Sequence, residues 1–110
     1  MNENMKTDYY CTNCVEYKTD KELLNYKCNI CNKYVLCKFS TNNGDKAIKR
    51  ILASEVEVND MITIPYSDDF RRVLGINYNK TEALIGLQEY RMVKIRLTAR
   101  VEKLEGAWYL

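Results

Sequence analysis

Residues 11–14 read CTNC and residues 28–31 read CNIC, and these two stretches decide how the first third of the chain folds. Each stretch is a pair of cysteines separated by two residues, and thirteen residues lie between Cys14 and Cys28. Two thiolates three positions apart point from one tight turn toward a common point. Two such turns can therefore close a tetrahedron of sulfurs around Zn²⁺. The spacing predicts a zinc site with Cys11, Cys14, Cys28 and Cys31 as ligands.

The two stretches, in CTNC and YKCNICNKYV, resemble the zinc ribbon family, and the resemblance covers only residues 8–39. It implies two cysteine knuckles at the ends of short β-hairpins. Asn32 follows the second pair and tolerates the left-handed backbone conformation that such a knuckle needs. Val15 follows the first pair and does not tolerate it. We therefore expect the first turn to differ in geometry from the turns of the family.

Other uses of the cysteines are less favoured. The cysteine count is five, the beginning of the chain has no apolar signal, and no apolar stretch is long enough to span a membrane. These features favour a reducing, cytoplasmic setting and argue against disulfides. A rubredoxin-like iron site needs a longer separation between the pairs, and a thiol redox role needs a βαβ pattern that is absent here. Cys37 shares a face with Val35 and Phe39, so we expect it to be a buried apolar residue.

The rest of the chain predicts a second domain, residues 40–110, after a zinc ribbon in residues 1–39. Residues 45–53 have the spacing of a short amphipathic helix, with Ala47, Ile48, Ile51 and Leu52 on one face. Short alternating runs follow at residues 61–64, 70–76 and 83–87, separated by turn residues. The predicted class is therefore α+β, with a short helix and an antiparallel β-sheet or small β-barrel after the ribbon.

The clearest predicted strand lies near the end of the chain. Its apolar face is formed by Val93, Ile95, Leu97, Ala99 and Val101. The opposite face carries Met92 and the polar or charged residues Lys94, Arg96, Thr98, Arg100 and Glu102. This alternation predicts one long strand with one face in the core and the other in solvent.

Composition argues against an enzyme. The chain has 110 residues, 46% of them hydrophobic, and contains no histidine, the usual general base near neutral pH. Asp68 and Asp69 are adjacent and point to opposite sides of an extended chain, which makes a poor catalytic pair. Four cysteines around a zinc ion also leave no open position for water.

Two kinds of partner remain. Nucleic acid is suggested by Lys94, Arg96 and Arg100, joined by Arg71 and Arg72. However, the formal charge of +2 falls to about zero once four thiolates and Zn²⁺ are counted, and phosphate binders are usually basic.

A protein partner is suggested by the nine tyrosines and one tryptophan, among them Tyr9, Tyr10 and Trp108. Tyrosines near the cysteines fit a shield for the metal equally well. We expect a non-enzymatic zinc-binding adaptor or inhibitor that binds a protein. A nucleic-acid-binding role in transcription or translation is the alternative, and the oligomeric state is left open.

Overall fold

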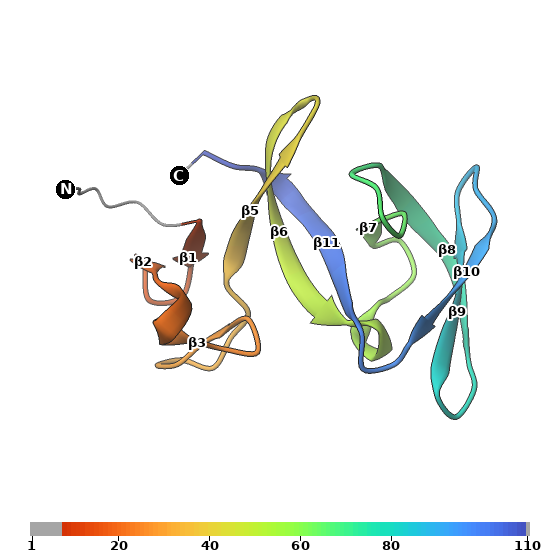
Figure 1. Ribbon diagram of the computed structural model, residues 1–110, viewed down its shortest axis with the longest axis horizontal. Helices are drawn as coiled ribbons and strands as arrows, with labels where there is room; N and C mark the ends of the chain where they lie inside the picture. The colour runs from red at the N-terminus through yellow and green to blue at the C-terminus, as the bar shows by residue number, and fades with distance from the viewer. Residues whose placement is uncertain (1–7, 110) are drawn as a thin grey trace. The chain divides into compact units, whose positions relative to one another are not determined.

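A computed structural model describes residues 8–109, and this part of the chain is almost entirely β-structure (Figure 1). It contains eleven strands and two 3₁₀ helices of three residues each. The described residues form two compact units. One comprises residues up to Lys49 together with those from Glu105 onward, and the other comprises Arg50–Leu104. Two long strands, β6 (Gly44–Leu52) and β11 (Arg100–Ala107), contribute residues to both units.

The first unit is built around the cysteine pairs. Its strands follow one another in the order β11-β6-β5-β1-β2, and a separate two-stranded sheet pairs β3 with β4. The elements are β1 (Tyr9–Cys11), β2 (Glu16–Lys18), the 3₁₀ helix η1 (Asp20–Glu22), β3 (Leu23–Leu24), β4 (Lys27–Cys28) and β5 (Leu36–Thr41). All pairings between β1, β2, β5 and β6 are antiparallel.

The expected helix over residues 45–53 is wrong, because most of these residues form β6. Thr41 lies opposite Gly44 at the end of a tight hairpin, and β6 then pairs with β5 from Gly44 to Ile48. Gly44 has a φ of 105°, a conformation that favours glycine. Ala47 and Ile48 are adjacent and both buried, so apolar residues that would line one helix face occupy both faces of a strand. Pairing with β5 outweighs a weak local preference for helix.

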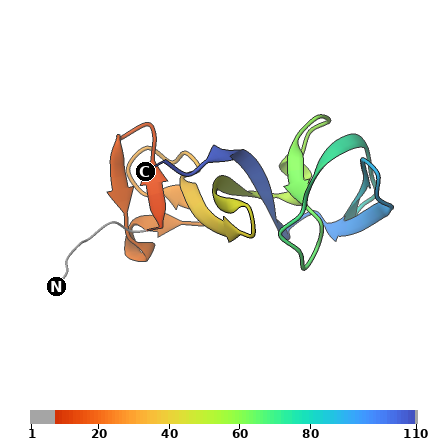
Figure 2. The same ribbon diagram turned by 90° about the horizontal axis from the view of Figure 1, so that it is seen from above.

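The second unit is an antiparallel sheet with strands in the order β10-β9-β8-β7-β11-β6. Figure 2 shows this sheet bending strongly between β7 and β10. Its elements are the 3₁₀ helix η2 (Ala53–Glu55), β7 (Met61–Thr63), β8 (Phe70–Tyr78), β9 (Glu82–Leu87) and β10 (Met92–Arg96). The predicted antiparallel sheet in this part of the chain is confirmed, whereas the α+β class is not.

The single long strand predicted near the end of the chain is interrupted. A turn at residues 97–99 separates β10 from β11, closed by a hydrogen bond from the Ala99 N–H to the Arg96 carbonyl (3.0 Å). The alternation survives on both sides of the turn. Val93 and Ile95 are half-buried and Val101 is buried, while Lys94 and Arg96 are exposed. A period of two cannot reveal the turn, because the residues that form it continue the same alternation.

Each unit has its own set of buried apolar side chains. In the first unit these are Cys11, Cys28, Val35, Cys37, Ala47 and Ile48. In the second they are Ile51, Ala53, Val56, Ile62, Ile64, Val73, Ala83, Ile85, Leu87 and Val101. The first core is small and half of it is cysteine, so apolar burial contributes little there. Within the described residues, no helix is long and apolar enough to cross a membrane.

We predict that Ile48→Ala lowers the free energy of unfolding by about 2–5 kcal/mol, because it empties a fully buried site in β6. Ile30→Ala removes the same atoms from a side chain that is 73% exposed and should change stability by no more than about 0.5 kcal/mol. Urea unfolding of both variants measures the difference. Equal effects would contradict the position of Ile48 in the core.

Candidate metal centre

The four predicted ligands come from two turns that different strands bring together. Cys11 is the last residue of β1 and Cys14 lies in the turn that leads to β2. Cys28 is the last residue of β4 and Cys31 lies in the turn after it. Cys11 and Cys28 are buried, whereas Cys14 and Cys31 are half-buried. The site therefore has a closed inner side and a partly open outer side.

The four sulfur atoms are close enough to bind one metal ion. All four Sγ atoms lie within 4.8 Å of one another. The Cys11 and Cys31 sulfurs are 3.5 Å apart and the Cys14 and Cys28 sulfurs are 3.9 Å apart. A tetrahedral ion with bonds of about 2.3 Å to sulfur requires sulfur separations of about 3.8 Å. The predicted metal ligands thus fit a four-coordinate site, and none of the five cysteines forms a disulfide.

The first knuckle has the backbone conformation that we predicted its sequence would disfavour. Val15 has a φ of 56°, in the left-handed region, although it is β-branched. The Cys14 N–H donates a hydrogen bond to the Cys11 sulfur (3.3 Å). The expectation of a divergent first turn is therefore wrong. Ligation needs the chain to turn back after Cys14, and Val15 bears the conformational cost of that turn.

The second knuckle shows the same features with a residue suited to them. Asn32 has a φ of 60°, as its sequence position predicts, and its N–H donates to the Cys28 carbonyl (2.8 Å). The Ile30 N–H donates to the Cys28 sulfur (3.4 Å). The Cys28 N–H donates to the Lys33 carbonyl (2.9 Å). Together these hydrogen bonds fix the backbone of the second knuckle.

The thiols differ strongly in acidity in the absence of a cation. The backbone N–H of Cys31, helped by that of Ile30, lowers the pKa of Cys28 to about 6, although burial acts in the opposite direction. Burial and hydrogen bonds to the neighbouring sulfurs raise the pKa of Cys14 to about 12. Cys28 therefore ionises before Cys14, and Cys14 needs a nearby cation before it can ionise near neutral pH.

A lysine provides positive charge beside the cluster. Lys18, in β2, is 1% exposed, and its Nζ lies 2.6 Å from Oε1 of Glu16. The Glu16 carboxylate, with a smaller contribution from the Cys28 sulfur, raises the pKa of Lys18 against the effect of burial. Four thiolates and one divalent ion carry a net charge of −2, so a buried ammonium partly neutralises the centre.

Tyrosines surround the cysteine unit, and the structure places them between core and surface. Tyr9, Tyr10, Tyr17, Tyr26 and Tyr34 are all half-buried. The rings of Tyr10 and Tyr17 pack edge to face with centroids 5.1 Å apart. The ammonium of Lys27 lies 4.8 Å from the centre of the Tyr34 ring. These rings supply packing that so small a unit otherwise lacks.

Cys37 takes no part in the cluster. It is fully buried in β5, and its sulfur lies 3.9 Å from the Val35 carbonyl. It pairs across the sheet with Tyr9 on one side and Ile48 on the other. Its predicted role as a buried apolar residue is confirmed.

The other residues predicted to contact a partner are spread over several elements. Lys94 and Arg96 are exposed in β10, and Arg100 donates to the Arg50 carbonyl (3.1 Å) at the start of β11. Arg71 and Arg72 lie in β8, where Arg71 pairs with Asp69 (2.9 Å). Tyr9 and Tyr10 lie in β1, and the Trp108 N–H donates to the Asp45 carbonyl (3.0 Å).

Sequence reasoning missed two residues near these sites. Lys18 was not singled out because lysine is almost never fully buried, and its position two residues after Glu16 is the only local signal. Tyr66 was missed as well. It follows Pro65, the only proline in the chain, in a turn where proline and a left-handed residue are neighbours.

We predict that Val15→Gly raises the free energy of unfolding by about 1 kcal/mol, because glycine adopts the left-handed conformation without steric cost. Val58→Gly is the matched control. Val58 is also exposed but has no positive φ, so glycine there should cost about 0.4–1 kcal/mol. Thermal melting of the metal-loaded variants measures both effects. Destabilisation by Val15→Gly would contradict the knuckle geometry.

Comparisons with known proteins found no relative of this chain. The cysteine unit is therefore interpreted from its own distances and backbone geometry. No protein-family model, no curated protein sequence and no solved structure gives a significant match.

Proposed function

We propose that this protein is a non-enzymatic zinc-binding protein that acts by binding another protein. The observation that carries the proposal is the cluster of four cysteine sulfurs within 4.8 Å of one another. In this proposal zinc holds the cysteine unit folded, as in the zinc ribbon family. The second unit presents a surface to the partner. Thiolate ligation requires reduced cysteines, so we place the protein in a reducing compartment such as the cytoplasm.

Zinc is the metal that the ligand set favours. Thiolates suit both zinc and iron, but an all-sulfur tetrahedral site most commonly holds structural zinc. Four cysteines complete its coordination, so the ion has no open position for substrate or water. The absence of histidine from the sequence removes the most common acid–base catalyst as well. Both points support a structural rather than a catalytic metal.

The charges of the second unit support a protein partner more than a nucleic acid. Several of its basic side chains are already engaged inside the unit. Arg71 pairs with Asp69, Lys103 with Asp60 (3.4 Å) and Arg50 with Glu102 (3.7 Å). Phosphate binders instead present many uncompensated basic groups on one face.

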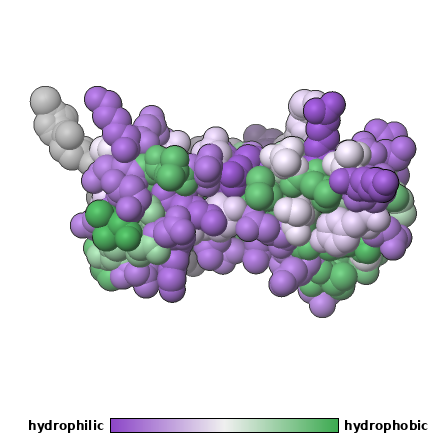
Figure 3. All heavy atoms as spheres, turned by 90° about the horizontal axis from the view of Figure 1, so that it is seen from below, coloured by the Kyte–Doolittle hydropathy of each residue, from purple (hydrophilic) through white to green (hydrophobic). Residues whose placement is uncertain are grey.

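Exposed apolar side chains give the protein partner a physical basis. Tyr66, Leu74 and Met92 are large apolar residues of the second unit, and all three are exposed. Leu74 lies where the register between β8 and β9 shifts, which leaves it outside the regular pairing. Figure 3 shows apolar surface alternating with polar surface on one face of the molecule. Such a mixture is typical of protein interfaces.

We predict that the purified protein contains one zinc ion per chain and that Cys28→Ser releases it and unfolds the cysteine unit. Zinc binding in small modules contributes on the order of 10 kcal/mol, more than this unit gains from its small apolar core. Elemental analysis and thermal melting measure the two effects.

Cys37→Ala is the matched control for that experiment, because Cys37 is buried outside the cluster. It should lower stability but leave the zinc content unchanged. Iron in place of zinc would contradict the identity of the metal. A Cys28→Ser variant that melts like the original protein would contradict the structural role of the site.

We predict that proteins captured from a cell extract by the immobilised, zinc-loaded chain remain bound after nuclease treatment. A protein interface does not depend on nucleic acid, whereas capture through phosphates does. Mass spectrometry of the captured proteins, with the metal-free chain as control bait, measures this. Loss of every captured protein upon nuclease treatment would reject the protein-binding function.

A further inference from the structure

Strand β10 has one long edge without a neighbouring strand. β10 pairs with β9 over five residues, from Met92 opposite Gly86 to Arg96 opposite Glu82. In the strand order of the described residues, β10 stands at the end of the sheet. The alternate N–H and carbonyl groups of such an edge point outward and can pair with another extended chain.

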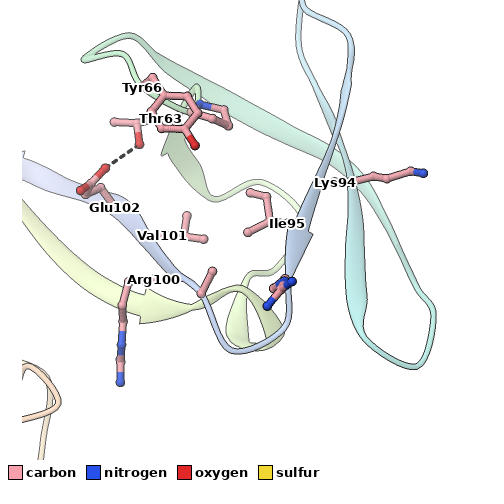
Figure 4. Close-up of a pocket in the computed structure, with 10 residues that line it drawn as sticks. Thr63, Tyr66, Lys94, Ile95, Arg100, Val101 and Glu102 are labelled. Carbon is pink, nitrogen blue, oxygen red and sulfur yellow. Dashed lines mark hydrogen bonds between the residues drawn. The ribbon is translucent and has the colours of Figure 1, made fainter.

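A groove runs along this free edge. Its volume is about 380 Å³, and it is lined by residues of β10, of the start of β11 and of the loop between β7 and β8. No residue of β9 is among the residues that line it, so it lies on the side of β10 away from β9. Figure 4 shows Ile95 and Val101 pointing into this space and Lys94 pointing away from it.

The two faces of β10 differ in chemistry. Val93 and Ile95 are half-buried on the inner face, whereas Met92, Lys94 and Arg96 are exposed on the outer face. A strand added beside β10 would place alternate side chains on the same two faces. Acidic side chains would lie beside Lys94 and Arg96. Apolar side chains would lie against Ile95 and Val101.

The same charges disfavour pairing between two copies of this chain. If β10 paired with its own copy, Lys94 and Arg96 would lie against the same basic residues of the other strand. Like charges directly opposite each other across a sheet are destabilising. An acidic strand meets no such penalty, so charge favours a different chain over a second copy.

A tyrosine at one end of the groove adds an apolar contact. Tyr66 lies beside Thr63 and is fully exposed (Figure 4). The Ser67 N–H donates to the Ile64 carbonyl (3.0 Å), which closes a turn with Pro65 and Tyr66 at its centre. Tyr66 has a φ of 64°, at a position where glycine is preferred. A large exposed ring held in a strained conformation is expected where the ring is used for binding.

We propose that the free edge of β10 and this groove bind an extended segment of a partner protein in which acidic and apolar residues alternate. The segment adds to the sheet as a further strand beside β10. This inference rests on the proposed protein-binding function and names the surface and the chemistry of the bound segment.

The test uses the full, zinc-loaded chain and fluorescein-labelled eight-residue peptides. One library alternates glutamate with apolar residues, and a control library alternates lysine with the same apolar residues. Fluorescence anisotropy measures binding to the original chain. Acidic peptides should bind saturably, because their glutamates would lie beside Lys94 and Arg96. Lysine peptides should bind at least about tenfold more weakly, because like charges would then face each other across the strands.

Two variants locate the site. Lys94→Glu combined with Arg96→Glu should weaken acidic peptides by at least about tenfold. Lys21→Glu combined with Lys80→Glu, the same total charge change at two exposed positions outside β10 and its groove, should alter binding by less than about twofold. Tyr66→Gly should weaken binding without lowering the melting temperature, because it removes the ring and relieves the turn.

Backbone methylation of the best peptide tests strand addition itself. In an added strand only alternate N–H groups face β10. N-methylation of one alternate set should abolish binding, whereas methylation of the other set should leave it within about threefold. Equal effects of the two sets would overturn the proposal.

Three other results would overturn the proposal about β10. Each can be told apart from a failure of the proposed protein-binding function. Nuclease-resistant partners that still bind the Lys94→Glu/Arg96→Glu chain would reject this surface but keep the protein-binding function. A dimer that dissociates on that charge reversal would assign the edge to a second copy. If the chain binds single-stranded RNA but no peptide, and Lys94→Glu/Arg96→Glu abolishes that binding, the edge of β10 would be assigned to nucleic acid.

Discussion

The cluster of four cysteine sulfurs is the constraint around which the first unit is arranged, because it brings two turns of the chain within metal-binding distance. The apolar core of this unit is small and half of it is cysteine, so under the function proposed above ligation would replace the burial that larger domains use. Each cysteine pair lies at a different turn, so one bound ion would join two segments of the chain. Val15, the residue after the first pair, has a positive φ although it is β-branched.

The electrostatics of the centre extend beyond its ligands. Backbone N–H groups stabilise the Cys28 thiolate, while Cys14 stays protonated until a cation is present. Four thiolates carry more negative charge than a divalent ion can neutralise. The buried ammonium of Lys18 lies near this excess negative charge and is paired with the carboxylate of Glu16. A metal held by all four cysteines would have no vacant coordination position.

The second unit combines a sheet that buries apolar side chains with one strand, β10, at the end of the strand order of the described residues. Val73, Ala83 and Ile85 are fully buried, so β8 and β9 form a rigid base for β10. β10 itself has only one neighbouring strand among the described residues, and basic side chains mark its outer face. A rigid strand with an open edge suits recognition of an extended chain, because little order is lost when backbone hydrogen bonds form.

The sequence by itself determined the clustering of the four cysteines, the buried role of Cys37 and the antiparallel strands at residues 61–64, 70–76 and 83–87. These depend on local spacing and on a period of two. Only the tertiary structure decided that residues 44–52 form a strand, because pairing with β5 overrides the helical spacing. It also decided the turn at residues 97–99, the burial of Lys18 and the groove beside β10. Each of these depends on which segments pair and pack in the folded chain, which the hydrophobic period of a single segment does not record.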